Sequence, residues 1–447
     1  MELWVPLFVL LTMKLRATAL AFFSLSGFLP ASVSADGHRT VAITDVAVVS
    51  MTDSRVREHQ TVIIHDRVIA ATGAERRVRV PRDARVISGT GRWLVPGLVD
   101  MHTHVDHLED LALMVAHGVT TTLNMGGASE AYTTVLAPQL RTGRTIGPYP
   151  LLALKIDGPG DEGGTSVVPR TEAEAREFVR TARQHGYDYI KVYSRLQPAI
   201  FEAIMDEARR AGIPVVGHVV RSVGIEHSLA RGQVMIAHGE EYLTVFGDGP
   251  PAESRIPELV RLSVRYHVTV TANVAGITLI AEQWGHPDAV ERYLRRDEAL
   301  EMRPELRVRW KHAAYQRFGG TYDAEARFVQ HLVAALHAAR VPIIVGTDTP
   351  DIPGVPPGAS AVDEIMMLHQ IGFTNYEALA AGTREAGRFV ARTLPAQPRF
   401  GEVRRGYRAD LLLLTGNPLE DLTAIRRPLA VIANGNVVGL TASAAKH

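Results

Sequence analysis

The sequence from Leu94 to His104 reads LVPGLVDMHTH. Its apolar part, from Leu94 to Val99, is typical of a strand that is buried on both faces, as in a parallel sheet. Side chains two residues apart on a strand point to the same side, so His102 and His104 can bind one metal ion at the strand end. A histidine pair at this spacing is a weak signal alone, because surface or core histidines also produce it. Its weight comes from the rest of the chain.

Apolar runs typical of strands recur after this stretch, with helix signals between them. A capping box at 171–174 opens a helix that should end at Gly186, and Pro198 begins another that should end before Gly212. Eight strands alternating with helices predict a (β/α)8 TIM-type barrel in an α/β protein. The expected strands are Leu94–His104, Thr120–Asn124, Tyr149–Ile156, Tyr189–Tyr193, Pro214–Val219, Val234–His238, Val268–Asn273 and Pro342–Thr347.

Both ends of the chain are rich in short β runs, at 40–50, 60–70 and 85–88 and again at 409–414 and 429–438. We expect these ends to pair into one small β-sandwich domain. The segment 277–322 is long, charged and helix-like, and we expect it to pass over the barrel mouth and shape a substrate pocket. The expected domain limits are 1–35 for a signal peptide, 36–93 and 395–447 for the two parts of the sandwich, and 94–394 for the barrel.

The composition limits the classes of function. The 48 basic residues balance the 48 acidic residues, so no bulk field attracts nucleic acid or an anionic membrane. With 447 residues and 46% hydrophobic content, the chain can form one or two large soluble domains. The chain has no cysteine, so disulfides, thiolate ligands and a cysteine nucleophile are excluded. Any metal must be bound by histidine, carboxylate or a modified side chain.

The N-terminal segment indicates export. Lys14 and Arg16 form a short basic region, residues 17–29 are largely apolar, and residues 33–35 read VSA, a small-residue cleavage site. Translation can begin at Met1 or at Met13. The alternative, a membrane anchor, is disfavoured because the apolar runs are too short to span a bilayer. We expect cleavage before a mature start near Asp36, a periplasmic or secreted product, and no stable membrane anchor afterwards.

Four further residues that can bind metal stand at the ends of later strands. Because the carboxyl ends of barrel strands share one face, all six residues can converge there. Taken singly, each has a structural alternative: a buried core histidine, a lysine at a sheet edge, or an aspartate that caps a helix. The six candidates are His102, His104, Lys191, His218, His238 and Asp348.

Lys191 lies between Ile190 and Val192 in a strand predicted to be buried. Burial favours the neutral amine, which reacts with carbon dioxide to form a carbamate. Such an N6-carboxylysine is an oxygen ligand that can bridge two metal ions.

With these residues in place, the chain resembles the amidohydrolase superfamily, in the branch of imidazolonepropionase-like and Xaa-Pro dipeptidase-like enzymes with a carboxylated lysine. The resemblance covers nearly everything after the signal segment. It includes the motif at 95–104, the lysine, the two later histidines and the aspartate. It also includes GYRADL at 406–411 and GNPL at 416–419. These motifs together are specific for the superfamily and leave the substrate open.

The resemblance implies a binuclear centre of two divalent ions, with zinc favoured and manganese, iron or cobalt as alternatives. His102, His104 and Asp348 would bind the more buried ion, and His218 and His238 the outer one. Carboxylated Lys191 would bridge the two ions. Asp348 would act as the catalytic residue, taking a proton from the attacking water and passing it to the leaving group.

The chain departs from the family pattern at Val220, where dipeptidase-like relatives often carry a tyrosine that polarises the carbonyl. Tyr193 or Tyr242 could replace that tyrosine, and Arg221 could hold a substrate carboxylate. All three are also explained as ordinary residues of the barrel rim. We expect four other histidines to lie on the surface or in packing positions: His107, His117, His185 and His227.

The sequence therefore predicts an exported, metal-dependent amidohydrolase that cleaves an amide or peptide-like C–N bond in a small molecule. The same site could instead act on an ester, lactone, carbamate or aryl amide, including xenobiotics and toxins. A catalytically silent binding protein would lack a ligand, and none is missing. Homo-oligomerisation is an open expectation for a barrel of this kind.

Overall fold

The computed structural model describes residues 40–160, 166–247 and 249–439. The predicted signal peptide, 1–35, lies outside these residues. Among the described residues, no helix has both the length and the apolar character needed to cross a membrane.

Eight parallel strands form a barrel in chain order, from β6 to β13. The ring closes where Met101 N donates to Val345 O at 2.9 Å and Asp348 N donates to His102 O at 2.8 Å. The predicted TIM-type barrel is therefore confirmed. The strands are β6 (Leu98–Thr103), β7 (Val119–Asn124), β8 (Tyr149–Ile156), β9 (Tyr189–Val192), β10 (Val215–Gly217), β11 (Gln233–Ala237), β12 (Thr269–Thr271) and β13 (Ile343–Ile344).

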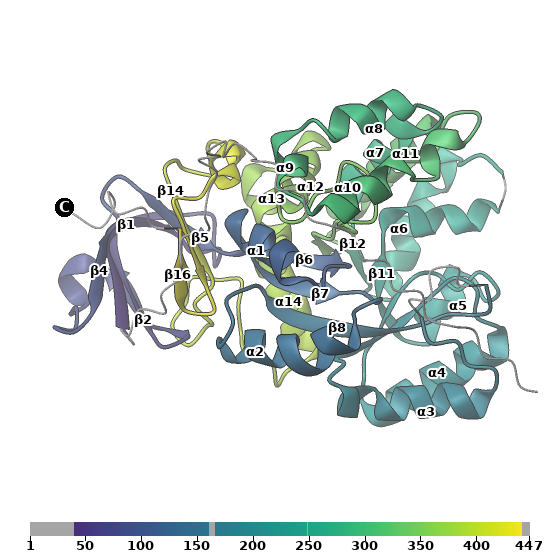
Figure 1. Cartoon of the computed structure of the whole chain (residues 1–447), viewed down its shortest axis with the longest axis horizontal. Coiled ribbons are helices and arrows are strands. Elements are labelled where there is room, and N and C mark those ends of the chain that lie inside the picture. Colours follow the sequence, from purple (N-terminus) through teal and green to yellow (C-terminus); the bar gives the residue numbers. More distant parts are fainter. Residues whose placement is uncertain (1–39, 161–165, 248, 440–447) are drawn as a thin grey trace, which may run out of the picture. The chain divides into compact units, whose positions relative to one another are not determined.

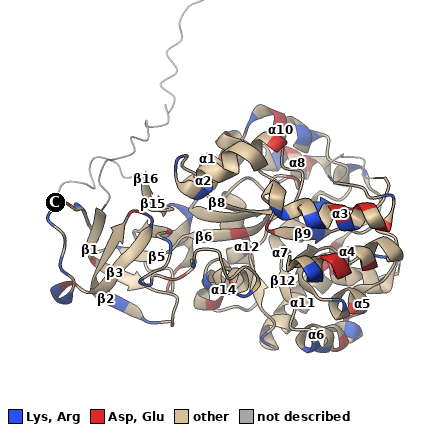
Figure 2. Ribbon diagram, turned by 90° about the horizontal axis from the view of Figure 1, so that it is seen from below, with Lys and Arg blue, Asp and Glu red and all other residues tan. Residues whose placement is uncertain are grey.

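Helices surround these strands (Figure 1), and two of them follow the predicted signals. Thr171 accepts a hydrogen bond from Glu174 N at 3.2 Å before α3, and α4 starts at Pro198 and ends at Gly212 with φ 64°. Basic and acidic residues alternate along these two helices (Figure 2), consistent with the neutral net charge. The surrounding helices are α1 (Leu108–Ala116), α2 (Ala137–Thr142), α3 (Glu172–Ala182), α4 (Pro198–Ala211), α5 (Ile225–Ala230), α6 (Ile256–Arg265), α11 (Asp323–Ala338), α12 (Ala359–Gln370), α13 (Asn375–Ala381) and α14 (Arg384–Thr393).

A second, mixed sheet joins the two ends of the described chain, as expected for the small sandwich domain. Its strand order is β16-β15-β14-β5-β1-β2-β3, and β4 pairs with β1. A separate apolar core lies in this sheet, with Ile43, Leu94 and Leu413 all buried. The strands are β1 (Thr40–Val49), β2 (Val56–His65), β3 (Val68–Ala74), β4 (Arg85–Ser88), β5 (Trp93–Pro96), β14 (Leu411–Leu414), β15 (Ala430–Ala433) and β16 (Asn436–Val438).

The strand expected at 94–104 is in fact two strands in two different sheets. β5 pairs with β1 and β14, whereas β6 pairs with β7. The chain changes partner at Gly97, whose N–H donates to Asp410 O at 2.8 Å, while the next N–H donates to Gly118 O at 2.9 Å. A Cβ at Gly97 would lie 2.3 Å from Thr120 Oγ1, so the junction requires glycine. His104 lies just beyond the end of β6.

The segment 277–322 is helical, as predicted. It contains most of α7 (Val274–Gln283) and all of α8 (Pro287–Tyr293), α9 (Asp297–Leu300) and α10 (Pro304–Lys311). Trp310 and Tyr293 are fully buried within its own apolar core. Arg309 and Tyr315 from this segment line a pocket with the strand-end histidines, so the segment does shape the barrel mouth.

Candidate metal centre

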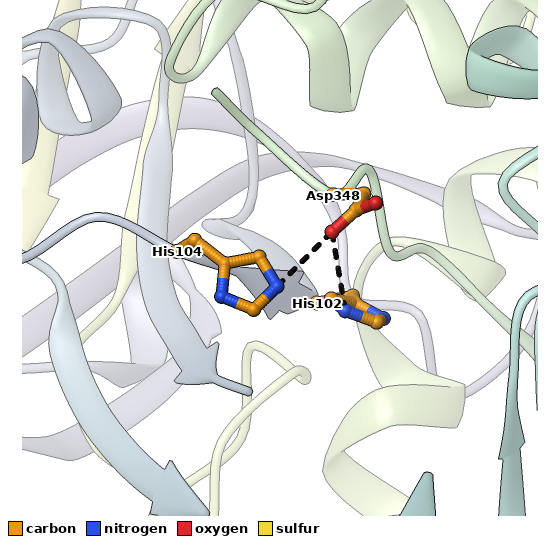
Figure 3. A group of neighbouring side chains, drawn as sticks. All are labelled: His102, His104 and Asp348. Carbon is orange, nitrogen blue, oxygen red and sulfur yellow. Dashed lines mark ion pairs between the residues drawn. The ribbon is translucent and has the colours of Figure 1, made fainter. Parts of the chain in front are cut away.

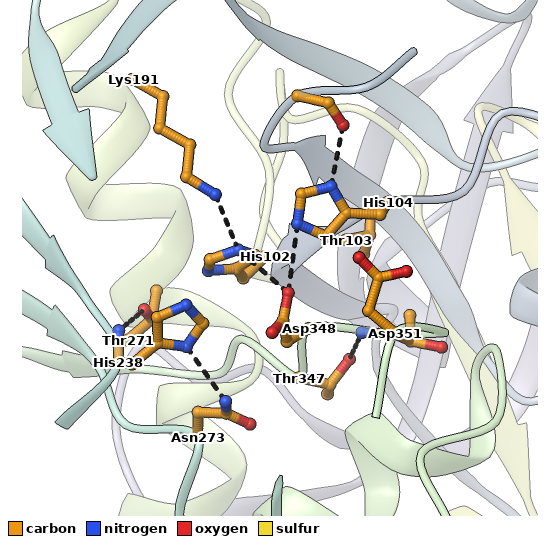
Figure 4. Close-up of polar contacts among 12 residues, drawn as sticks. His102, Thr103, His104, Lys191, His238, Thr271, Asn273, Thr347, Asp348 and Asp351 are labelled. Carbon is orange, nitrogen blue, oxygen red and sulfur yellow. Dashed lines mark hydrogen bonds and ion pairs between the residues drawn. The ribbon is translucent and has the colours of Figure 1, made fainter. Parts of the chain in front are cut away.

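The six candidate residues come from five barrel strands and lie together at the carboxyl ends of those strands. His102 belongs to β6 and Lys191 to β9. His104, His218 and His238 follow directly after β6, β10 and β11, and Asp348 lies four residues beyond the end of β13. Figure 4 shows Lys191, His238, His104 and Asp348 around His102. The convergence expected from the strand order is therefore present.

His102, His104 and Asp348 form the tightest group (Figure 3). Asp348 Oδ1 lies 3.3 Å from His102 Nε2 and 3.1 Å from His104 Nε2. One ligand atom from each residue lies within 4.8 Å of the others, close enough for one ion to contact all three. The pKa of Asp348 is lowered: burial alone would raise it, but the hydrogen bond from His104 and the nearby His238 and Lys191 outweigh burial. The Asp348 carboxylate is therefore ionised at neutral pH.

Lys191 is only 1% exposed, and its Nζ lies 3.2 Å from His102 Nε2. Burial lowers the pKa of Lys191 from 10.5 to about 8. The neighbouring strand makes room for the side chain at Gly217, where a Cβ would lie 2.9 Å from Lys191 Cγ. The amine thus lies among imidazoles and loses its proton more readily than the amine of an exposed lysine.

His238 and His218 complete the cluster. The ring centroid of His238 lies 4.3 Å from that of His102 and 5.0 Å from that of His218. Burial lowers the pKa of His238 to about 3, and burial together with Lys191 lowers the pKa of His102 well below 6.5. Both rings are therefore neutral at pH 7, the form that binds metal ions.

Hydrogen bonds to the other ring nitrogen orient two of the histidines. His104 Nδ1 donates to the carbonyl of Gly126 at 2.8 Å. His218 Nδ1 pairs with Glu241 Oε1 at 2.6 Å, and the second oxygen of Glu241 accepts from Val219 N at 2.7 Å. Burial would raise the pKa of Glu241, but the charge and hydrogen bond of His218 lower it. A proton fixed on Nδ1 leaves Nε2 of both rings as the free electron-pair donor.

The fourth imidazole, His238, has an amide neighbour. Asn273 Nδ2 lies 3.0 Å from His238 Nδ1, while Asn273 Oδ1 is buried without a hydrogen-bond partner among the described residues. With the amide turned over, His238 Nδ1–H donates to Oδ1 and Nε2 becomes a metal donor. The unpartnered oxygen thus fits a metal-binding state of His238.

The backbone is strained at three residues that lie beyond the carboxyl ends of barrel strands. His238, Asn273 and Asp348 are non-glycine residues with φ of 77°, 51° and 64°. The left-handed region costs most residues free energy and is concentrated at functional sites. Strand-end turns of this kind direct the side chains of His238 and Asp348 inward.

Asp100, which the sequence analysis did not single out, joins the two ends of the barrel sheet. It is fully buried and accepts hydrogen bonds from His102 N, Thr347 N and Thr347 Oγ1 at 3.1, 3.1 and 2.7 Å. Burial raises the pKa of Asp100 to about 7, against these three hydrogen bonds. Asp100 therefore holds the backbone next to His102 and Asp348. Its position two residues before His102, on the same strand face, is the signal that could have found it.

A pocket of about 230 Å3 opens above the cluster. Sequence reasoning named Tyr193, whose ring lies 3.9 Å from that of His218, but missed five other polar side chains of the lining and two glycines, Gly126 and Gly127. The carboxylates following His238 were visible in the motif HGEE, whereas residues of the 277–322 segment carry no comparable signal. The five polar side chains are Lys155, Glu240, Arg309, Tyr315 and Asp351.

Other named residues lie outside this pocket. Tyr242 is fully buried, and its hydroxyl forms a hydrogen bond with Ser263 Oγ at 2.7 Å. Arg221 lines a neighbouring pocket of about 470 Å3. Val220 is fully buried. His107, His185 and His227 are exposed and His117 is half-buried, as predicted for surface or packing positions.

Comparisons with known proteins show what this chain is similar to. Ochratoxinase of Aspergillus niger is 24% identical over 482 aligned positions, covering 90% of this chain and 89% of that protein. The structure of a bottromycin amidohydrolase aligns with a TM-score of 0.69 and 25% identity, over 90% of this chain and 88% of that chain. The structure of a Xaa-Pro dipeptidase with bound methionine has the same fold, with a TM-score of 0.65 and 19% identity over 89% and 99% of the two chains.

A model of the amidohydrolase family matches residues 93–438, which include the whole barrel and all six strand-end residues. The protein belongs to the amidohydrolase family and is a hydrolase of carbon–nitrogen bonds.

Proposed function

We propose that this protein is a metal-dependent amidohydrolase that hydrolyses an amide or peptide-like bond of a small molecule. The observation that carries the proposal is the position of Lys191, buried with its amine 3.2 Å from His102 Nε2. A lysine serving only as a surface charge would not lie among neutral imidazoles. A carbamate on this amine would place oxygen ligands between the two histidine groups.

The donor set fits two divalent ions. His102, His104 and Asp348 would hold one ion, His218 and His238 the other, and carboxylated Lys191 would bridge them. Nitrogen and oxygen donors without a thiolate suit zinc, and also manganese, iron or cobalt. When bound, such ions supply an activated water and a Lewis acid for the substrate carbonyl.

The residues of the chain supply the proton transfers and the substrate environment. Asp348 is ionised at neutral pH, so it can accept the proton of the attacking water and pass it to the leaving nitrogen. Tyr193 lines the same pocket and could polarise the substrate carbonyl, a role for which the buried Val220 offers no hydroxyl. The pocket volume of about 230 Å3 fits a small substrate group.

The named activities of the relatives support an amide-type substrate. This chain is similar to a comparable degree to ochratoxinase, bottromycin amidohydrolase and Xaa-Pro dipeptidase. A panel of matched amide, ester and carbamate substrates tests the choice of bond. We expect the amides to give the highest kcat/KM. A preference for the esters or carbamates would contradict this part of the proposal.

Replacing Lys191 with alanine tests the proposal that carboxylated Lys191 bridges two metal ions. We expect the K191A variant to lose the second equivalent of metal and essentially all activity, measured by elemental analysis beside the rate. Lys311, an exposed residue of α10, provides the matched control K311A. A K191A protein with two metal ions and the full rate would overturn the proposal.

We further propose export through the N-terminal segment, on the pattern of residues 13–35. N-terminal sequencing of protein recovered from the periplasm or the medium should begin near Asp36. An intact N-terminus on protein that remains in the cytoplasm would contradict export and leave the hydrolase proposal unaffected.

A further inference from the structure

Glu364 of α12 is a buried carboxylate that lies outside the metal pocket and caps another helix. Its side chain is 0% exposed. Its Oε1 accepts a hydrogen bond from Val274 N at 2.9 Å, and its Oε2 accepts one from Ala275 N at 2.7 Å. These are the first two N–H groups of α7, which have no acceptor within their own helix. Glu364 therefore supplies the N-terminal cap of a helix that begins 90 residues earlier in the chain.

This distant cap replaces one that the neighbouring residue would normally provide. Asn273 stands at the N-cap position of α7, and asparagine is among the preferred capping residues, yet its side chain makes no capping hydrogen bond. Its Nδ2 lies instead 3.0 Å from His238 Nδ1 (Figure 4). Its backbone has φ 51° and ψ 36°, whereas a residue that caps its own helix is usually extended. Capping α7 and contacting His238 are thus divided between two residues.

The first turn of α7 leaves room for the amide of Asn273. A Cβ at Gly276 would lie 2.3 Å from Asn273 Oδ1 and 2.9 Å from Asn273 Cγ. Glycine inside a helix is less favourable than alanine, because its backbone loses more conformational freedom on folding. At this position the missing side chain lets the amide fold back over the helix start and reach His238.

We propose that Glu364 is a positioning residue for His238, acting through the start of α7 and Asn273. By binding the N–H groups of Val274 and Ala275, Glu364 fixes the backbone directly after Asn273 and leaves the Asn273 amide free for His238. A hydrogen bond to one ring nitrogen determines which nitrogen of a histidine can bind a metal ion. The inference rests on the proposed metal centre and extends its support to a helix that carries none of the six candidate ligands.

The zinc affinities of single and double variants test this coupling. Glu364→Gln keeps the shape of the side chain but has one oxygen for two N–H groups, so it should loosen the start of α7. We expect the affinity for one of the two zinc ions, measured by competition with a chelator, to fall about 10- to 100-fold in N273A and about 3- to 10-fold in E364Q. Because both changes act on one contact, the N273A/E364Q double variant should bind zinc as N273A does. Losses that multiply in the double variant would overturn the inference.

Glu377 provides the matched control. Its carboxylate also accepts a hydrogen bond at the start of a helix, from Thr374 N at 2.9 Å, and that helix, α13, carries no candidate metal ligand. E377Q should therefore keep the zinc affinity of the wild type. An equal loss in E364Q and E377Q would show a general effect of helix capping and overturn the inference. If E364Q does not fold, E364D, which keeps the charge on a shorter side chain, replaces it in every measurement.

A second readout uses the metal-free protein and does not depend on hydrolysis. In protein that contains isotope-labelled histidine, the ring nitrogen chemical shifts of His238, identified by their loss in H238Q, report the hydrogen bond at Nδ1. We expect N273A and E364Q to change these shifts in the same direction, and E377Q to leave them unchanged. Unchanged shifts in E364Q would overturn the inference. Failure of the proposed function is a separate result, seen as a wild type that binds no zinc, and the spectra of the metal-free protein still decide the role of Glu364.

Discussion

Glu241 holds His218 in an orientation that suits a metal ligand, although Glu241 is not among the residues that line the candidate metal pocket. Its carboxylate accepts a hydrogen bond from His218 Nδ1 at 2.6 Å and another from Val219 N at 2.7 Å. Partners of this kind typically contribute 10- to 100-fold to metal affinity.

We expect Glu241→Gln to weaken metal binding by about 10- to 100-fold, because a neutral amide fixes the ring tautomer less firmly. Metal affinity measured by competition with a chelator checks this. Glu240→Gln, a change of the adjacent carboxylate in the pocket lining, is the matched control and should leave metal affinity close to that of the wild type. Equal affinity in E241Q and the wild type would mean that the contact does not orient His218.

The amine of Lys191 predicts a pH dependence for reconstitution of the metal-free protein. Burial lowers its pKa from 10.5 to about 8, and only the neutral amine forms a carbamate. The neutral fraction rises from about one tenth at pH 7 to about nine tenths at pH 9. At a constant concentration of dissolved carbon dioxide, zinc uptake should therefore become roughly tenfold faster over this interval. Uptake at the same rate throughout would show that Lys191 is not carboxylated from the free amine.

At the level of elements, the centre depends on how closely β9 and β10 approach each other. Gly217 has φ 121°, and a Cβ there would lie 2.3 Å from Val192 O and 2.9 Å from Lys191 Cγ. Glycine removes the side chain that would push these strands apart at the position of Lys191.

Gly217→Ala should therefore lower the free energy of unfolding by about 3 kcal/mol or more, through the clash and the positive φ together. Gly212→Ala is the control, because Gly212 also has positive φ but nothing lies within 4 Å of its Cβ position. That change should cost only about 1–2 kcal/mol. Urea unfolding curves of both variants measure the difference, and equal losses would show that β10 moves aside freely.

Across the described molecule, a buried ion pair ties the C-terminal segment of the mixed sheet to the barrel. Arg408 and Asp410 are 4% and 3% exposed, and Arg408 donates hydrogen bonds to Asp410 Oδ2 and to Thr121 Oγ1 of β7. Gly97 N, where the chain passes between the two sheets, donates to Asp410 O at 2.8 Å.

Arg408→Met should lower the free energy of unfolding by about 3–5 kcal/mol, because it leaves the Asp410 carboxylate buried without its counter-charge. Adding Asp410→Asn should recover part of that loss, since the neutral amide still accepts the hydrogen bond from Asn434 N at 2.7 Å. Chemical unfolding of the single and double variants measures whether the second substitution raises the free energy of unfolding above that of R408M. A double variant less stable than R408M alone would show that the charge is not the source of the loss.

The barrel and the six strand-end residues were predictable from local patterns. Apolar runs of strand length alternate with helix signals, and parallel strands of one barrel end on one face. A residue directly after such a run, such as His238 or Asp348, must therefore lie near the others, whatever its distance along the chain.

Contacts between distant segments could not be predicted from local sequence patterns. The separation of β5 from β6 depends on a change of hydrogen-bond partner at Gly97, from Asp410 to Gly118. Lys155 and Arg309 line one pocket because β8 and the 277–322 segment meet in space. The tautomers of His104 and His218 depend on Gly126 and Glu241. The periodicity of apolar residues indicates which face of a helix or strand is buried. Which residues contact that face is determined only by the packing of the folded chain.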